Sequence, residues 1–210
     1  MNRYTTFPVE AMDENYYENE ANVENYTKFT PAHDGAQLVD ALREHVEPHA
    51  SVLELGIGPG KDLKRLKEYF EVTGSDYSQL FLERYRKTDS KADLLHLDAR
   101  TLDTDRTFDA IFSNKALIHL SPDELQQSFD RQHDVLNDNG VIMHSFWYGE
   151  GEDTFNGLKL VYHNEKDLTA MLKHKFTIIA LHKHAKQAEN DSIYVLASKK
   201  HELGVESLVT

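Results

Sequence analysis

The chain has no cysteine, no long run of apolar residues and few basic side chains. The absence of cysteine excludes a disulfide framework and a thiolate metal site. No apolar stretch is long enough to cross a bilayer, and the first residues lack the apolar core of a secretory signal, so we expect a soluble cytoplasmic protein. A formal net charge of -13 over 210 residues, without a stripe rich in Lys or Arg, disfavours nucleic acid and favours a small-molecule partner.

Glycine is also infrequent, but three of the 10 glycines fall within one short segment. Val52–Leu55 is mostly apolar and predicts a buried strand. Gly56, Gly58 and Gly60 then form a turn that connects this strand to a following helix. Glycine allows a sharp turn and lets the backbone approach a ligand that a Cβ would obstruct. Because such turns also occur for packing alone, the segments that follow decide between a structural turn and a nucleotide-cofactor loop.

Two carboxylates follow the glycine segment, each at the end of a predicted strand. The residues from Glu71 to Asp76 predict a second strand, and those from Leu94 to Ala99 predict a third strand that contains Asp98. In doubly wound folds a carboxylate at the end of the second strand binds the ribose hydroxyls, and the carboxylate of Asp98 can accept from an adenine amino group. Both could instead merely cap their loops, but their order behind the glycine segment favours a nucleotide pocket.

Four segments together resemble the motifs of class I S-adenosylmethionine-dependent methyltransferases, and the resemblance extends from about Val52 to Lys199. The segments are Leu53–Gly60, Gly74–Ser78, Leu97–Arg100 and Phe108–Asn114, the last continuing to Leu120. Lys61 stands where the third glycine of the G-x-G-x-x-G motif of nicotinamide dehydrogenases would fall. An NAD-dependent oxidoreductase is therefore the lesser alternative.

The resemblance implies a Rossmann-like, doubly wound α/β fold. We expect a seven-stranded sheet with helices on both faces and a C-terminal antiparallel hairpin. It also implies S-adenosylmethionine as cofactor, S-adenosylhomocysteine as product, and no metal. Glu54 would help hold the methionine amino group, Asp76 the ribose and Asp98 the adenine. The residues that the resemblance assigns to cofactor binding are Glu54, Gly56, Gly58, Gly60, Asp76, Tyr77, Asp98, Ala99, Asn114 and Lys115.

The rest of the chain predicts a single domain. We assign residues 1–32 to a lid, 33–200 to the core and 201–210 to a tail. Helices are predicted over residues 33–46, from Ser121 to a stop at Asn139-Gly140, and over Glu165–Lys173; the second begins with a capping box, Ser121 to Glu124. Strands are predicted over residues 141–147, 176–184 and 192–198; the last two form a hairpin with the apolar strand inside. His182 and His184 share one face of the edge strand, but without a third ligand they imply no metal.

Several side chains are candidates for the walls of the pocket and for proton transfer. His119 follows the fourth strand and is the candidate proton acceptor, although it could simply pack in its loop. The first thirty residues are aromatic and acidic, so Tyr16, Tyr17 and Tyr26 could shield a sulfonium or stack on a substrate, or belong to an amphipathic helix. A flexible acidic loop that begins with Trp147 and Tyr148 is expected to form a second wall.

We therefore predict methyl transfer by in-line displacement to an oxygen or nitrogen nucleophile of a small molecule, carried out by a monomer or homodimer. Such a reaction depends mainly on positioning. The acidic residues of both walls favour a neutral or cationic acceptor, such as an amine. A non-catalytic protein that binds the cofactor as a sensed ligand stays open as an alternative.

Overall fold

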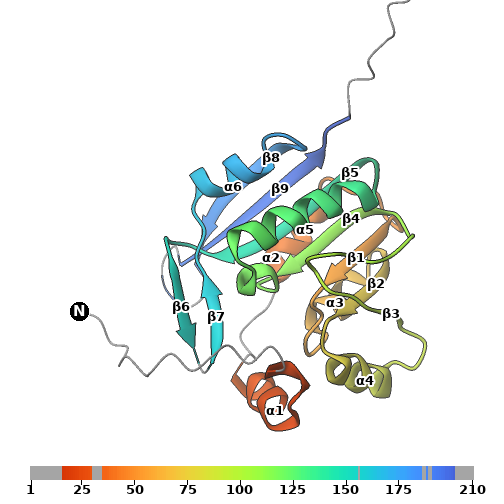
Figure 1. Cartoon of the computed structure of the whole chain (residues 1–210). Helices are drawn as coiled ribbons and strands as arrows, with labels where there is room; N and C mark the ends of the chain where they lie inside the picture. The colour runs from red at the N-terminus through yellow and green to blue at the C-terminus, as the bar shows by residue number, and fades with distance from the viewer. Residues whose placement is uncertain (1–15, 30–34, 156, 186–187, 189–190, 202–210) are drawn as a thin grey trace, which may run out of the picture.

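The computed structural model describes residues 16–29, 35–155, 157–185, 188 and 191–201. Its centre is a seven-stranded sheet of order β3-β2-β1-β4-β5-β9-β8 (Figure 1). β1, β2, β3, β4 and β5 run parallel, whereas β9 is antiparallel to both β5 and β8. The strands are β1 (Ser51–Leu55), β2 (Glu71–Asp76), β3 (Asp93–His96), β4 (Phe108–Asn114), β5 (Leu136–Trp147), β8 (Phe176–His184) and β9 (Ser192–Lys199). The predicted fold and its C-terminal hairpin are confirmed.

Helices cover both faces of this sheet because neighbouring residues of its strands point to opposite sides. In β4, Ile111 packs in the same core cluster as Phe129 of α5, whereas Phe112 packs with Leu42 of α2. Figure 1 shows α5 lying across the front of the sheet. The helices of the core are α2 (Ala36–Arg43), α3 (Lys61–Leu66), α4 (Gln79–Thr88), α5 (Pro122–Val135) and α6 (Glu165–Leu172).

Some predicted boundaries were wrong where tertiary pairing competes with local signals. The capping box of Ser121 and Glu124 is present, but α5 ends at Val135 because Leu136 already pairs with Phe108 in the sheet. Asn139-Gly140 therefore lies in an irregular stretch of β5, not at a helix stop. β3 ends at His96, so Asp98 follows the third strand instead of belonging to it. Of the helix expected over residues 33–46, the structure shows the part from Ala36 to Arg43.

The expectation of a flexible acidic loop after β5 was partly wrong, because Glu152 and Asp153 at its end belong to a β-hairpin. β6 (Glu152–Phe155) pairs antiparallel with β7 (Leu158–Val161). The amide of Tyr162 donates to the carbonyl of Gly151, and the amide of His163 donates to that of Trp147. These bonds attach the base of the hairpin to the end of β5.

A short N-terminal pair of helices lies against α4, below the sheet in Figure 1. It consists of η1 (Tyr16–Glu18) and α1 (Glu20–Phe29). Val23 of α1 is fully buried. The predicted lid over residues 1–32 falls partly outside the described residues, as does most of the predicted tail over 201–210, so both assignments stay predictions. Among the described residues, no helix has the length and apolar character needed to cross a bilayer.

Candidate functional site

A cavity of about 290 Å³ lies at the carboxyl ends of the parallel strands, between the sheet, η1 and the β6–β7 hairpin. Many of the residues that the sequence assigned to the site line it, while Glu54, Gly60, Trp147 and Tyr148 do not. The predicted residues that line the cavity are Gly56, Gly58, Asp76, Tyr77, Asp98, Ala99, Asn114, Lys115, His119, Tyr16, Tyr17 and Tyr26.

The three glycines after β1 have different structural roles. Gly56 adopts φ +72°, and a Cβ there would come within 2.5 Å of the Cβ of Ala116, so only glycine fits between β1 and β4. At Gly58 the nearest atom to an added Cβ is Cε1 of Tyr26, 3.8 Å away, and the backbone faces the open cavity. Gly60 lies outside the cavity, and a Cβ there would meet the ring of Tyr85 at 2.2 Å. The structure therefore places Gly60 in a packing position at the start of α3.

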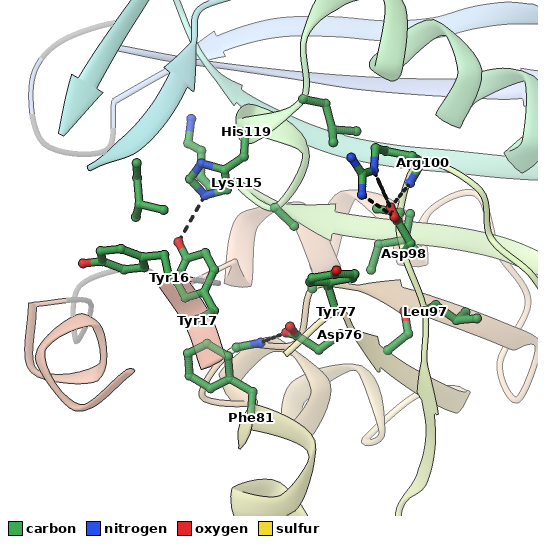
Figure 2. Close-up of a pocket in the computed structure, with 18 of the residues that line it drawn as sticks. Tyr16, Tyr17, Asp76, Tyr77, Phe81, Leu97, Asp98, Arg100, Lys115 and His119 are labelled. Atoms are coloured by element: carbon green, nitrogen blue, oxygen red, sulfur yellow. Dashed lines mark hydrogen bonds and ion pairs between the residues drawn. The ribbon is translucent and has the colours of Figure 1, made fainter. Parts of the chain in front are cut away.

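The carboxylate of Asp76 is held at the floor of the cavity by two backbone amides. Its Oδ2 accepts from the amide of Gly58 at 2.9 Å, and its Oδ1 accepts from the amide of Ser78 at 2.8 Å. Burial raises the pKa of Asp76 to about 6, although both hydrogen bonds act in the opposite direction. The ring of Tyr77 lies next to it, 51% of the residue being exposed (Figure 2).

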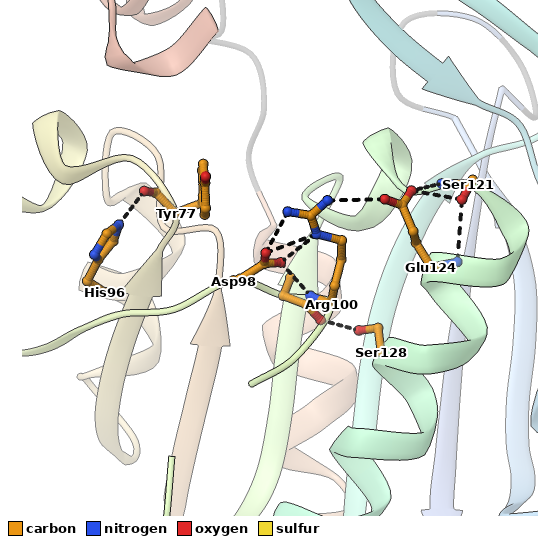
Figure 3. A network of polar contacts seen from close by, with 8 residues as sticks. Tyr77, His96, Asp98, Arg100, Ser121, Glu124 and Ser128 are labelled. Atoms are coloured by element: carbon orange, nitrogen blue, oxygen red, sulfur yellow. Dashed lines mark hydrogen bonds and ion pairs between the residues drawn. The ribbon is translucent and has the colours of Figure 1, made fainter. Parts of the chain in front are cut away.

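A second carboxylate, Asp98, also lines the cavity and belongs to an ion-pair network (Figure 3). The Nε and Nη2 of Arg100 donate to it at 2.7 to 3.0 Å, and Nη1 donates to Glu124 at 3.2 Å. Burial would raise the pKa of Asp98, but the hydrogen bonds from Arg100 outweigh it and the pKa lies below its ordinary value. Asp98 is therefore an ionised hydrogen-bond acceptor.

Glu54 lies beneath the glycine segment, buried and away from the cavity lining. Its Oε2 has no hydrogen-bond partner among the described residues. Burial, together with the charges of Asp62 and Asp76, raises the pKa of Glu54 well above its ordinary value. An orphaned buried carboxyl oxygen of this kind fits the approach of a cationic group.

Asn114 and Lys115 close the cavity at the end of β4. The side chain of Asn114 donates to Asp62 at 2.8 Å and accepts from Ser145 at 2.7 Å, so it is held in one orientation. The ammonium of Lys115 donates to the carbonyl of Phe146 and to Oγ of Ser192, which ties it to β5 and β9. The backbone of Lys115 adopts a left-handed φ of 62°.

Trp147 and Tyr148, expected in the second wall, lie outside the cavity. The ring of Trp147 stacks on the ammonium of Lys115 at 4.1 Å, and the hydroxyl of Tyr148 accepts from Lys183 at 2.8 Å. The hairpin itself supplies this wall. Its residues that line the cavity are Gly157, Leu158 and Lys159.

His119 lies between the N-terminal helices and the hairpin (Figure 2). Its Nδ1 is 2.7 Å from the carbonyl oxygen of Lys159, and its Nε2 is 3.2 Å from the hydroxyl of Tyr17. A carbonyl can only accept, so Nδ1 carries the hydrogen and Nε2 accepts from the phenol. Burial lowers the pKa of His119, which keeps the imidazole neutral at neutral pH.

Aromatic rings form the lid side of the cavity. The ring of Tyr17 packs edge-on against Tyr16 at 5.1 Å and Tyr26 at 5.4 Å, and lies 5.9 Å from Phe81. Three of the described acidic residues of the two walls are engaged outside the cavity. Glu18 accepts from the amide of Gln79, Glu24 pairs with Lys28 and Glu152 pairs with Lys159, and none of the three acids lines the cavity. These three residues therefore provide no support for a cationic acceptor, and that expectation stays a prediction.

Sequence reasoning did not assign several residues of the lining. Arg100 belongs to the motif segment Leu97–Arg100, and Glu124 belongs to the capping box. The sequence therefore indicated where each residue lies in the chain, but not that the two side chains contact each other. Phe81, Leu158 and Lys159 carried no such signal. Among the described residues, no group of three or more His, Asp or Glu side chains could hold a metal ion.

The doubly wound sheet, the glycine turn and the two carboxylates that follow β2 and β3 are typical of the nucleotide-cofactor sites of Rossmann-like folds. The sequence model of the methyltransferase-domain family matches residues 52–140. A comparison with curated protein sequences found no significant match.

Solved structures resemble the whole chain. The 1,6-didemethyltoxoflavin-N1-methyltransferase of Burkholderia thailandensis, with bound 1,6-didemethyltoxoflavin and S-adenosylhomocysteine, has 20% identity and a TM-score of 0.70 over 94% of both chains. An S-adenosylmethionine-dependent methyltransferase of Clostridium acetobutylicum has 16% identity and a TM-score of 0.70 over 87% of this chain and 100% of its own. The N-methyltransferase NodS of Bradyrhizobium japonicum, with S-adenosylhomocysteine, has 15% identity and a TM-score of 0.68 over 90% of this chain and 96% of its own.

These comparisons confirm the resemblance that the motifs indicated. Residues 52–140 match the model of the methyltransferase-domain family, and the chain as a whole has the fold of the S-adenosylmethionine-dependent methyltransferases to which it is similar.

Proposed function

We propose that the protein transfers the methyl group of S-adenosylmethionine to an oxygen or nitrogen atom of a small molecule. The observation that carries the proposal is the placement of two carboxylates, Asp76 and Asp98, in the lining of one cavity to which Gly56 and Gly58 also belong. This is the arrangement that an adenosyl group requires in a doubly wound fold. Two of the structural relatives are named as N-methyltransferases, which supports nitrogen as one acceptor atom.

The residues of the cavity fit the cofactor. Asp76 would accept from the ribose hydroxyls, and the ionised Asp98 would accept from the adenine amino group beside Ala99 and Tyr77. Asn114 and Lys115, which line the cavity, would hold the methionine end of the cofactor. Glu54 lies outside the lining with an unpaired Oε2, so its assignment to the methionine amino group stays a prediction that requires its side chain to turn towards the cavity. The cofactor supplies an activated methyl group on a sulfonium. The protein then has to position the nucleophile in line and exclude water, an effect worth roughly 7 to 11 kcal/mol in favourable cases.

We assign His119 as the proton acceptor, because its Nε2 lone pair faces the lid side of the cavity and its tautomer is set by the carbonyl of Lys159. An acceptor that loses a proton during transfer needs such a base, whereas an alkylamine that is already neutral does not.

We further propose residues 1–32 as a lid over the core of 33–200, with a tail over 201–210. The protein would be a cytoplasmic monomer or homodimer that does not act on nucleic acid. Light scattering measures the oligomeric state.

Isothermal calorimetry with S-adenosylmethionine, S-adenosylhomocysteine and NAD tests the cofactor. We expect micromolar binding of both sulfur compounds and no binding of NAD, followed by production of S-adenosylhomocysteine with a member of a small-molecule panel. NAD binding in their place would contradict the proposal and support an oxidoreductase. Cofactor binding without transfer to any acceptor would support the alternative of a cofactor-sensing protein.

A further inference from the structure

Tyr17 and His119 both line the cavity, and the hydroxyl of Tyr17 contacts the imidazole of His119 (Figure 2). We propose that Tyr17 takes the proton of the methyl acceptor and passes its own proton to His119, and that the acceptor is therefore a hydroxyl or ring N–H compound. The inference rests on the proposed function and assigns its acceptor class and a second residue that contacts the acceptor.

The direction of the hydrogen bonds permits such a relay. Because Nδ1 of His119 donates to the carbonyl of Lys159, its Nε2 lone pair must accept, and the phenol of Tyr17 donates to it. The lone pairs of the Tyr17 oxygen are then left for a donor in the cavity. An acceptor O–H or N–H can satisfy them, so a continuous path runs from acceptor to Tyr17 and on to His119.

The two side chains supply complementary properties. Burial, with further contributions from the charges of Tyr26, Tyr16 and Asp76, raises the pKa of Tyr17 far above its ordinary value, so Tyr17 stays a phenol and cannot itself be the base. Burial lowers the pKa of His119, so its lone pair stays available. Tyr17 therefore reaches the acceptor, and His119 stores the proton.

The position of Tyr17 depends on the same segment that holds Asp76. The carbonyl of Tyr17 accepts from Oγ of Ser78 at 2.6 Å, and the amide of Gln79 donates to Glu18 at 2.9 Å. Ser78 also donates its amide to Asp76. The phenol is thus tied to the proposed ribose site of the cofactor, and its ring packs against Tyr26 and Phe81.

His119 is tied to the opposite wall of the cavity. Its Nδ1 bond reaches Lys159 in β7, 40 residues away in sequence, whereas its Nε2 bond reaches Tyr17, 102 residues away. Lys159 is itself anchored to Glu152 of β6 at 2.7 Å. The relay is therefore assembled only when the N-terminal helices and the hairpin both contact His119.

Atoms and charge balance in this step. The bond from the acceptor atom to the methyl carbon forms while the bond from sulfur to that carbon breaks, and the electron pair stays on sulfur. The proton of the acceptor moves to the oxygen of Tyr17, and the phenol proton moves to Nε2 of His119. The positive charge lost from sulfur reappears on the imidazolium, which the carbonyl of Lys159 stabilises, and the proton later leaves to solvent.

The hydrogen-bond pattern can be tested without an acceptor, by NMR of the full chain labelled with 15N-histidine and saturated with S-adenosylhomocysteine. We expect His119 as the neutral Nδ1–H tautomer. Tyr17→Phe should move its Nε2 resonance towards that of a free imine nitrogen, while the remote variant Tyr69→Phe leaves it unchanged. An Nε2–H tautomer, or an Nε2 resonance that does not respond to Tyr17→Phe, would overturn the relay.

Turnover separates proton transfer from mere positioning. In His119→Asn the amide nitrogen can replace Nδ1 as donor to Lys159, but no atom replaces Nε2. On a panel of phenols and ring N–H heterocycles, we expect His119→Asn and Tyr17→Phe each to lower kcat about 10²-fold or more, with little change in KM for S-adenosylmethionine. The double variant should lose little more than either single one, because the two residues act as one unit.

The remaining outcomes distinguish the inference from the function on which it rests. Turnover that survives in His119→Asn would leave His119 only a positioning residue and overturn the relay. Turnover of alkylamines alone, or cofactor binding with no turnover of any phenol or ring N–H compound, would overturn the acceptor class. Failure of the native protein to bind S-adenosylmethionine would overturn the proposed function itself.

Discussion

Replacing Asp76 by asparagine tests the proposed ribose site. In the native protein both carboxylate oxygens accept backbone amides, from Gly58 and Ser78, and we propose that their remaining lone pairs accept from the ribose. Asparagine retains one acceptor oxygen and turns an NH₂ group towards the other donors. The loss of one or two charge-assisted hydrogen bonds, worth about 1.5 to 3 kcal/mol each, should weaken S-adenosylhomocysteine binding about 10- to 10⁴-fold.

The pKa of Asp76 adds a pH signature to this prediction. Since burial raises that pKa to about 6, lowering the pH from 7 to 5 should protonate the carboxyl and weaken binding by the native protein about tenfold. Asp76→Asn should show no such change between these pH values. The folded state also binds this proton more tightly than the unfolded one, so the carboxyl should lower the unfolding free energy of the native protein, relative to Asp76→Asn, by about 2 kcal/mol as the pH rises from 4 to 6.

Calorimetry at pH 5, 6 and 7 measures the affinities, and urea unfolding measures the stabilities. Asp93→Asn is the matched control, because Asp93 of β3 pairs with Arg106 and does not line the cavity. An affinity of Asp76→Asn within about threefold of the native value would refute the ribose assignment. A native affinity that is constant from pH 7 to pH 5 would refute the pKa argument.

Two further predictions concern stability, both measured by urea unfolding. Gly60→Ala should lower the unfolding free energy by more than the roughly 1 to 2 kcal/mol of left-handed strain, because its Cβ also meets the ring of Tyr85 at 2.2 Å. Gly151→Ala is the control for backbone strain alone, since no atom lies within 4 Å of an added Cβ at Gly151. Equal losses of unfolding free energy in the two variants would contradict the packing role of Gly60. Ser121→Ala should cost about 1 kcal/mol by removing the capping box of α5. A loss no larger than that of the exposed Ser90→Ala would show that the cap contributes nothing.

Local patterns were sufficient for much of the fold. The predicted bounds of the second strand and of the edge strand coincide with β2 and β8, because β-branched and apolar residues such as Val72 and Ile178 mark them without help from distant segments. The apolar residues from Ile193 onwards also indicated the inner position of β9. Where local and tertiary signals disagreed, pairing with β4 determined the boundary, as at Leu136.

The β6–β7 hairpin shows why other parts were missed. β6 is exposed along its whole length, and β7 is only partly buried. The two short strands pair only with each other in the described part of the chain, so no longer sheet pattern marks them. Acidic residues such as Glu152 suggested a flexible loop instead. The contacts that hold the hairpin, such as the amide of His163 to the carbonyl of Trp147, are long-range backbone bonds that do not depend on side-chain type.

By itself the sequence determined the doubly wound fold, the glycine turn and the order of the two carboxylates, because these depend on periodicity and on residues close together in the chain. Only the tertiary structure decided that Arg100 pairs with Asp98, that Trp147 lies outside the cavity and that Tyr17 donates to His119. The physical reason is that burial, hydrogen-bond direction and pKa are properties of an environment. For His119 that environment comes from segments 40 and 102 residues away.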